Sequence, residues 1–269
     1  SDSSVEKTPV SAPKIDDTKT NRSLALSLLD DTKLLIRNAQ YRLWRWRNPG
    51  VSFKEYIADI AEKDLARGRA HPTLGPNLTI GDPSESGRQT FDLLVSRYHI
   101  EPGDVCVEYG CGTLRVGRHA IAYLEPGHYW GLDIAQSFLD GGLALIGADV
   151  AAQKMPALRV ISELSVAETA AAKPKFLYSI SVLMHVHPDE LLEFMRNIVT
   201  IVGEQGFGVI AAQWTDTDTR QIGRQSWVHS FSALRAAVDA SGGVGEFIER
   251  NVRSDRVSGV IELRRAPVE

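Results

Sequence analysis

The sequence is poor in the residues that stabilise secreted proteins. Only two of its 269 residues are cysteines, and Cys106 falls in a predicted strand while Cys111 falls in a glycine turn. A stabilising disulfide between them is therefore not expected. Free thiols are typical of proteins in a reducing compartment, so we expect a cytoplasmic protein.

Long apolar runs and an excess of basic residues are missing as well. No run approaches the roughly 18 apolar residues of a membrane helix, and no charged-then-apolar signal sequence opens the chain, so no membrane span is expected. The formal net charge of −4 argues against general nucleic-acid binding. A hydrophobic content of 43% is instead typical of one large globular domain with an appendage.

The middle of the chain contains a strand, a glycine turn and a helix in succession. Apolar residues that alternate over 105–109 predict a short buried strand, which leads into Gly110 and Gly112 and then a helix over 113–124. A second strand follows and ends at Asp133. A glycine turn before a helix opens backbone N–H groups to a ligand, and an acid about 20 residues later binds ribose hydroxyls. The segment therefore predicts a nucleoside site.

The residues around the glycines indicate which nucleoside is bound. A dinucleotide turn has a third glycine where this chain has Arg115. Glu108, two residues before the first glycine, suits a cationic amino-acid group better than a phosphate. With Glu108-x-Gly110-x-Gly112 and an acid at the end of the second strand, the chain resembles the class I S-adenosylmethionine-dependent methyltransferases. Leu114 replaces the third glycine of the fuller family motif.

The resemblance extends over about residues 84–265. Residues 176–186 resemble the fourth strand of that family with its following loop, and residues 206–213 resemble the fifth strand. Strands that alternate with helices predict a mainly parallel sheet with helices on both faces, and a hairpin ends the chain. We expect an α/β fold with a doubly wound, mostly parallel seven-stranded sheet whose last strand is antiparallel.

The resemblance implies S-adenosyl-L-methionine as the cofactor. Glu108 would accept from its ammonium group and Asp133 would bind its ribose, while Arg115 either reaches its carboxylate or is simply exposed. Ser162 and Glu163 either contact the adenine amine or belong to a helix start. The full set of implied cofactor residues is Glu108, Gly110, Gly112, Arg115, Asp133, Ile134, Ser162, Glu163 and Ser181.

Two histidines after the fourth strand are candidate catalytic residues. His185 and His187 lie at the sheet edge where open α/β sheets bind ligands. A histidine titrates near neutrality and suits a hydroxyl acceptor that must lose a proton. The alternative is that a histidine here packs against the loop, and that His187 merely precedes a helix beginning at Pro188. A His-x-His metal pair lacks an evident third ligand, so no metal is expected.

A long loop is predicted after the fifth strand, on the same edge. Its aromatic residues Trp214 and Trp227 suit stacking on a sugar or ring, and Asp216 or Asp218 can hold hydroxyl groups. We expect Trp214, Asp216, Trp227 and His229 to bind the substrate. The alternative is a solvated loop in which Ser230 caps the next helix.

The N-terminal third is predicted to be separate from this domain. Residues 1–20 are polar and are expected to form a disordered tail, followed by a helical appendage or lid with a linker over 21–83 and the main domain over 84–269. Ser52 and Glu55 form a capping box that predicts the start of a helix. Within the appendage, residues 41–47 mix tryptophan with arginine, which indicates either an anionic contact or packing onto the main domain.

Taken together, these features predict a methyltransferase that acts on a small-molecule or glycan acceptor, at a hydroxyl oxygen. A homo-oligomer is possible. Two other functional classes stay open from the sequence: a non-catalytic nucleoside-binding module or subunit with the same fold, and a nicotinamide-dependent oxidoreductase.

Overall fold

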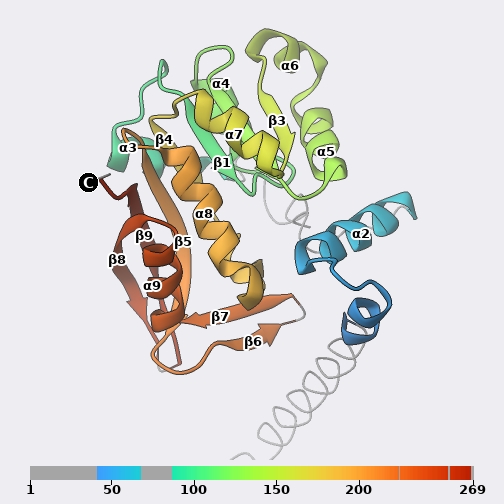
Figure 1. Cartoon of the computed structure of the whole chain (residues 1–269). Helices are drawn as coiled ribbons and strands as arrows, with labels where there is room; N and C mark the ends of the chain where they lie inside the picture. Colours follow the sequence, from blue (N-terminus) through green and yellow to red (C-terminus); the bar gives the residue numbers. More distant parts are fainter. Residues whose placement is uncertain (1–40, 68–86, 224, 254, 268–269) are drawn as a thin grey trace, which may run out of the picture. The chain divides into compact units, whose positions relative to one another are not determined.

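The computed structural model describes residues 41–67, 87–223, 225–253 and 255–267 (Figure 1). The chain divides into two compact units, residues 1–50 and 51–269. In the first unit, residues 41–47 are helical and the Trp46 side chain is 78% exposed. The tail expected over 1–20 and the domain boundary expected at residue 83 lie outside the described residues.

A mixed sheet forms the centre of the second unit. Seven of its strands lie in the order β3, β2, β1, β4, β5, β9, β8. The first five run parallel to one another, whereas β9 runs antiparallel to both β5 and β8. This arrangement confirms the predicted mostly parallel sheet with an antiparallel last strand, but the sheet in the described part of the chain has nine strands and not the predicted seven. The strands are β1 Cys106–Tyr109, β2 Tyr129–Asp133, β3 Ala157–Val160, β4 Phe176–Ser179, β5 Phe207–Thr215, β8 Gly243–Val252 and β9 Val257–Arg265.

A hairpin is added to this sheet where the sequence predicted a long loop. The strands β6 (Arg220–Gly223) and β7 (Ser226–Ser230) pair with each other in antiparallel fashion. Strand β7 also pairs in parallel with the last residues of β5. The loop prediction is therefore wrong for this segment. The strand pairing across the hairpin depends on contacts with β5, which local composition does not reveal.

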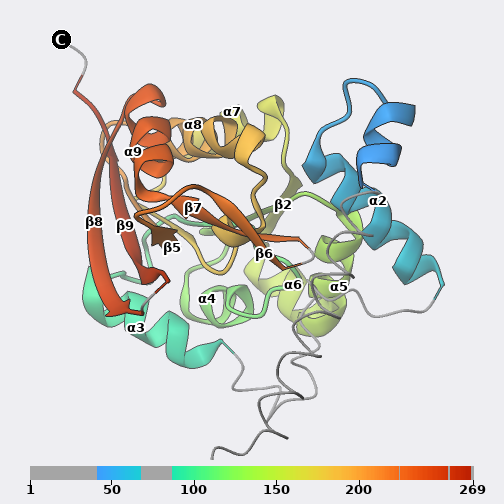
Figure 2. The same cartoon turned by 90° about the horizontal axis from the view of Figure 1, so that it is seen from below.

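Helices cover both faces of the sheet (Figure 2). Helices α7, α8 and α9 lie on one face, and α3 and α4 lie on the other. The helix bounds are α2 Phe53–Ala66, α3 Arg88–Tyr98, α4 Gly117–Tyr123, α5 Gln136–Ile146, α6 Ala148–Lys154, α7 Glu163–Ala171, α8 Leu191–Val202 and α9 Phe231–Ala240. Two 3₁₀ turns, η3 (Leu183–His185) and η4 (Pro188–Glu190), precede α8.

Successive side chains of β1 point to opposite faces of the sheet, and each face packs against its own apolar core. Val107 and Tyr109 belong to the core that contains residues of α8 and α9, whereas Cys106 belongs to the core with residues of α3 and α4. Both faces of β1 are buried, as a central parallel strand requires. Glu108 shares the face of Cys106, which places a carboxyl group between apolar layers at the end of the strand.

Helix ends follow the local signals in part. Ser52 and Glu55 form the predicted capping box of α2, since the Ser52 N–H donates to Glu55 Oε2 over 2.7 Å and the Glu55 N–H donates to Ser52 Oγ. Ser230 caps α9 by accepting from the N–H of Ala233. Helix α4 begins at Gly117 rather than at residue 113, because Leu114 adopts a φ of 62° that a helix cannot include. Helix α6 was not predicted.

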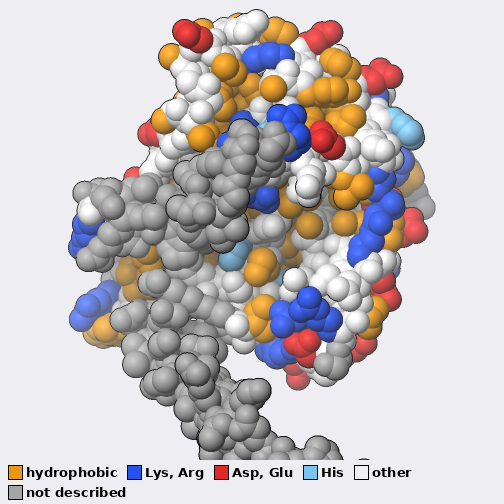
Figure 3. Space-filling model, turned by 180° about the vertical axis from the view of Figure 1, so that it is seen from behind, with side chains coloured by type: hydrophobic (Ala, Val, Ile, Leu, Met, Phe, Trp, Pro, Cys, Tyr) orange, Lys and Arg blue, Asp and Glu red, His pale blue; other side chains and the backbone are white. Residues whose placement is uncertain are grey.

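The surface carries charge of both signs. On the face shown in Figure 3, Lys and Arg side chains lie in several separate groups with acidic and hydrophobic side chains between them. Among the described helices, none is long and apolar enough to cross a membrane.

Candidate functional site

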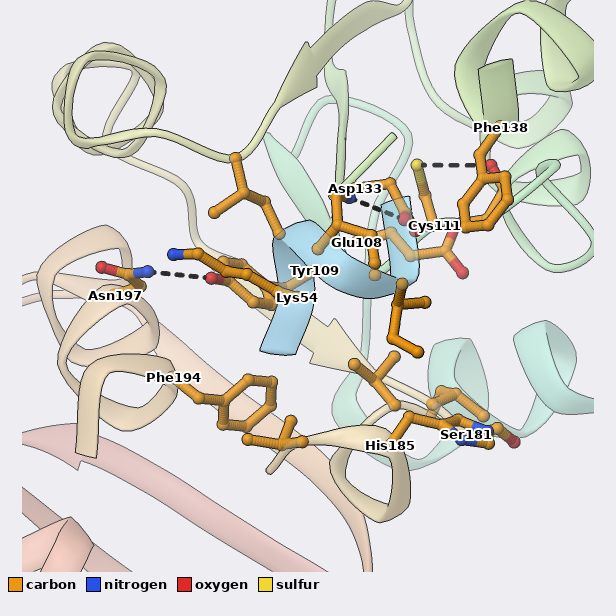
Figure 4. A pocket seen from close by; sticks show the side chains of 18 of the residues that line it. Lys54, Glu108, Tyr109, Cys111, Asp133, Phe138, Ser181, His185, Phe194 and Asn197 are labelled. Carbon is orange, nitrogen blue, oxygen red and sulfur yellow. Dashed lines mark hydrogen bonds between the residues drawn. The ribbon is translucent and has the colours of Figure 1, made fainter. Parts of the chain in front are cut away.

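A cavity of about 220 Å³ lies at the carboxyl ends of the central parallel strands. Its walls come from the ends of β1, β2 and β4, from η3 and α8, and from the first turns of α2 (Figure 4). In open α/β sheets this edge, where the strand order changes direction between β1 and β4, is the usual place for a ligand. Glu108, Cys111 and Asp133 lie together on one side of the cavity, and Phe194, Asn197 and His185 lie away from them.

The loop after β1 has the backbone geometry of a ligand-binding glycine turn. Gly110 has a φ of 85°, and a Cβ atom there would lie 2.3 Å from Val182 Cγ2. Gly112 has a φ of 52°, and a Cβ atom there would meet no heavy atom of the described chain within 4 Å. Leu114 also has a positive φ although it replaces a glycine of the family motif. Open space beside Gly112 therefore lets a ligand approach the loop backbone.

Asp133 fixes this loop. Its Oδ2 accepts from the Gly112 N–H over 2.6 Å, and its Oδ1 accepts from the Ile134 N–H over 2.7 Å. Burial raises the pKa of Asp133 to about 6, although both backbone N–H groups favour the charged form. Each carboxylate oxygen keeps a second lone pair, so Asp133 can hold the loop and still accept from a hydroxyl group of a ligand.

Glu108 is buried beside two tyrosines. Its Oε2 accepts from the hydroxyl of Tyr129 over 2.6 Å and from that of Tyr178 over 3.3 Å. Burial raises the pKa of Glu108 to about 8; the two tyrosine hydrogen bonds and the nearby charge of Arg115 lower it only in part. A cationic group brought next to this carboxyl would favour its ionised form. Glu108 and Arg115 both line the cavity.

The raised pKa of Glu108 makes a prediction about stability. Between the ordinary value of 4.5 and about 8, the folded protein holds a proton on Glu108 that the unfolded chain has lost. The free energy of unfolding should therefore fall as pH rises, by at most about 1.4 kcal/mol per pH unit from this group. We expect urea unfolding between pH 6 and 8 to show this slope in the wild type and a smaller slope in Glu108→Gln. Equal slopes in the two proteins would contradict a raised pKa of Glu108 in the folded protein.

Other predicted cofactor residues divide into two groups. Ile134 and Ser181 line the cavity together with Phe138 and Ile161, which the sequence did not single out. Ser162 and Glu163 do not line it. The Ser162 hydroxyl instead accepts from the Ser165 N–H as the N-cap of α7, and Glu163 is an exposed residue of the first turn. The helix-start alternative therefore describes both residues.

His185 lines the cavity from η3. Its Nδ1 lies 2.7 Å from the backbone oxygen of Gln225 and 3.4 Å from Ser226 Oγ. Gln225 lies in the turn of the added hairpin, and Ser226 is the first residue of β7. A carbonyl oxygen only accepts, so Nδ1 carries the hydrogen and the neutral ring keeps its lone pair on Nε2. This arrangement suits a proton acceptor.

His187 has a structural position instead. Its Nδ1 accepts from the Asp189 N–H at the start of η4. Its ring packs 5.2 Å from the ring of Phe53 and 5.3 Å from that of Trp227, between centroids. His187 does not line the cavity, so the alternative that it precedes a helix start is the one observed.

None of the four predicted substrate residues lines the cavity. Trp214 is buried in β5 against Phe247, and Asp216 is exposed just beyond that strand. Trp227 packs edge-on against Phe53 at 4.9 Å. His229 is 1% exposed in β7; burial lowers its pKa and outweighs the backbone groups of Leu183 and Val186. Strand pairing in β5 and β7 therefore places these four side chains outside the cavity lining.

The sequence missed most of the wall opposite the glycine loop. Helix α8 and the turn before it contribute Glu190, Glu193, Phe194 and Asn197, and α2 contributes Phe53, Lys54 and Ile57. The helical spacing of the first four was visible in the sequence, but nothing local showed that this face turns toward the ligand edge. Among the described residues, no group of three His, Cys, Asp or Glu side chains could hold a metal ion.

Comparison with known proteins gives structural matches only. No protein-family model matches the sequence, and no curated protein matches it. A solved structure of geranyl diphosphate C-methyltransferase from Streptomyces coelicolor A3(2), in complex with Mg²⁺, geranyl diphosphate and S-adenosyl-L-homocysteine, is similar with a TM-score of 0.56 and 13% identity. It covers 81% of this chain and 100% of that one.

A second similar structure is magnesium protoporphyrin IX methyltransferase from Synechocystis PCC 6803 with bound SAM. Its TM-score is 0.54 at 14% identity, and the match covers 81% of this chain and 99% of that one. At such identities the likeness concerns the fold. The strand order, the antiparallel β9 and the glycine loop at the end of β1 agree with it. This chain therefore has the fold of the class I S-adenosylmethionine-dependent methyltransferases.

Proposed function

We propose that this protein is an S-adenosylmethionine-dependent methyltransferase that methylates a hydroxyl oxygen of a small-molecule or glycan acceptor. The observation that carries the proposal is that one cavity joins the loop Glu108-x-Gly110-x-Gly112, Asp133 and the ring of His185. The similar enzymes from Streptomyces and Synechocystis, whose structures contain S-adenosyl-L-homocysteine and SAM, support the choice of cofactor. Cys106 and Cys111, both free and buried, fit the proposed cytoplasmic location.

The residues at the cofactor end of the cavity fit the three parts of S-adenosylmethionine. We define this end by Glu108, Arg115, Asp133, Ile134 and the glycine loop. Glu108 and Arg115 supply opposite charges for the amino and carboxylate groups, and Asp133 supplies oxygens for the ribose. The open side of Gly112 leaves room for the chain that joins them, and Ile134, Phe138 and Ile161 offer an apolar surface for adenine.

The protein has little covalent chemistry to perform in this reaction. The cofactor, when bound, supplies a methyl group on a positively charged sulfur. The protein must hold the acceptor in line and keep water away, and α2 and α8 provide the buried walls Phe53, Ile57 and Phe194 for this. His185 Nε2 would take the proton of the acceptor hydroxyl.

Calorimetric titration tests the proposal. We expect S-adenosylmethionine and S-adenosylhomocysteine to bind the purified chain at micromolar concentrations, and a nicotinamide dinucleotide to show no binding. Labelled methyl donor then allows acceptors to be screened. Binding of the dinucleotide alone would replace the proposal by an oxidoreductase, and binding of none of the three would favour a module without this chemistry.

A further inference from the structure

The polar side chains of η4 and α8 that line the cavity each contact another part of the protein. Glu190, Glu193, Phe194 and Asn197 follow one another at helical spacing and line the same wall. Glu190 accepts from the Lys54 N–H at the start of α2 over 3.0 Å, and Glu193 pairs with the Lys54 ammonium group. Asn197 donates to the hydroxyl of Tyr109 over 3.0 Å. Phe194 is the member of this row that offers an apolar side chain to a ligand.

Apolar side chains make up a second part of the cavity lining. We call this part the acceptor end and define it by His185 and the side chains of Phe53, Ile57, Val182, Val186 and Phe194. Phe53, Ile57 and Phe194 are 5 to 6% exposed, and Val186 is 9% exposed. Phe194 stands edge-on to the Tyr109 ring, 5.4 Å between centroids, so one wall is aromatic.

These walls disfavour a glycan. A sugar brings several hydroxyl groups, each of which needs a partner when it leaves water, and an unpaired buried hydroxyl costs about 1–3 kcal/mol. Glu190 and Glu193 bind Lys54 of α2 and Asn197 binds Tyr109, so the hydroxyl groups of a sugar would have to share these polar groups with the protein. The four residues expected to bind sugar hydroxyls or rings lie outside the cavity. A flat apolar body with a single hydroxyl group matches the acceptor end better.

A histidine base favours one class of acceptor hydroxyl group over another. A phenol loses its proton near pH 10, whereas an aliphatic hydroxyl holds its proton about as tightly as water, with a pKa near 16. Proton transfer to an imidazole is more effective the closer the two pKa values lie. The tautomer set by the Gln225 carbonyl leaves His185 Nε2 to receive that proton.

Resting on the proposed function, the geometry points to a phenol with a planar, largely apolar ring system as the methyl acceptor. The phenol oxygen uses the electron pair of its O–H bond to form the new O–CH₃ bond. The proton passes to His185 Nε2 and then to solvent, and the electrons of the broken S–CH₃ bond stay on sulfur. The products are an aryl methyl ether and S-adenosylhomocysteine.

An acceptor panel tests this assignment. After cofactor binding is established by calorimetry, labelled S-adenosylmethionine is offered to the protein with one- and two-ring phenols, with benzyl alcohols of the same ring size, and with methyl glycosides. We expect transfer to one or more phenols at rates at least tenfold above every alcohol and glycoside. Transfer to glycosides or alcohols at equal or higher rates, or to none of the phenols, would overturn the inference. If the cofactor itself does not bind, the proposed function fails first.

A variant of the apolar wall separates acceptor binding from cofactor binding. Ile57→Gln places an amide in the acceptor end, so we expect KM for the best phenol to rise about tenfold while the Kd for S-adenosylhomocysteine stays the same. Lys63→Gln, on the exposed side of the same helix, is the matched control and should leave both values unchanged. An unchanged KM in a folded Ile57→Gln protein would contradict the proposed ring position.

Discussion

Replacing Asp133 with alanine is expected to weaken S-adenosylmethionine binding about 100-fold or more. Two ribose hydroxyls would lose a charged acceptor, and each such hydrogen bond contributes about 1.5–3 kcal/mol. The same substitution removes the acceptor of the Gly112 N–H, so the glycine loop loses its anchor and must be ordered again when the ligand binds. Calorimetric titration of the two proteins with S-adenosylhomocysteine measures the effect.

Two controls make this result interpretable. Asp149→Ala removes an exposed acid from the first turn of α6, away from the cavity, and should bind the ligand like the wild type. Circular dichroism and thermal unfolding show whether the Asp133→Ala protein is folded at the temperature of the titration. A folded Asp133→Ala protein with wild-type affinity would rule out this residue as the ribose ligand.

Replacing His185 with alanine is expected to lower kcat by about 10²–10⁴-fold and to leave the Kd of the cofactor nearly unchanged. A positioned general base contributes a factor of this size, and His185 lies on η3 rather than in the glycine loop. The variant also frees the Gln225 carbonyl oxygen, which the imidazole N–H occupies in the wild type. Single-turnover methyl transfer to the acceptor identified by screening measures the chemical step.

The variant His185→Gln distinguishes proton transfer from packing. Glutamine can donate to the Gln225 carbonyl but cannot act as a base near neutral pH. If His185 is the base, both variants lose the acid limb of the pH profile of kcat, and glutamine restores little activity. Recovery of most of the wild-type rate in His185→Gln would show that the side chain only supports the loop.

The half of the site that lies on β1 and β2 was predictable because its signals are local. Glu108, Gly110 and Gly112 are neighbours in sequence, and Asp133 follows at the end of the next strand, so strand pairing alone brings the four together. The parallel order of the sheet followed from the alternation of strands and helices for the same reason. Ser162 shows the limit of a local signal, since a serine at this position serves as a cap and does not line the cavity.

The acceptor end of the cavity was not predictable because it depends on contacts between segments that are distant in sequence. Lys54 and Glu190 are 136 positions apart, and Phe53 meets Trp227 only because α2 reaches the end of the added hairpin. Trp227 and His229 have the composition of a binding loop, yet strand pairing in β7 decides which way they face. Propensity and motif spacing do not contain that information.

The close approach of Gly110 to Val182 links the two halves of the cavity. Val182 precedes η3, and its backbone oxygen accepts from the His185 N–H over 2.7 Å. A Cβ atom at position 110 would overlap the Val182 side chain, and the φ of 85° at this position already disfavours any residue with a side chain. Glycine at position 110 therefore allows the residue before η3 to pack directly against the glycine loop, and homologous sequences should keep this glycine.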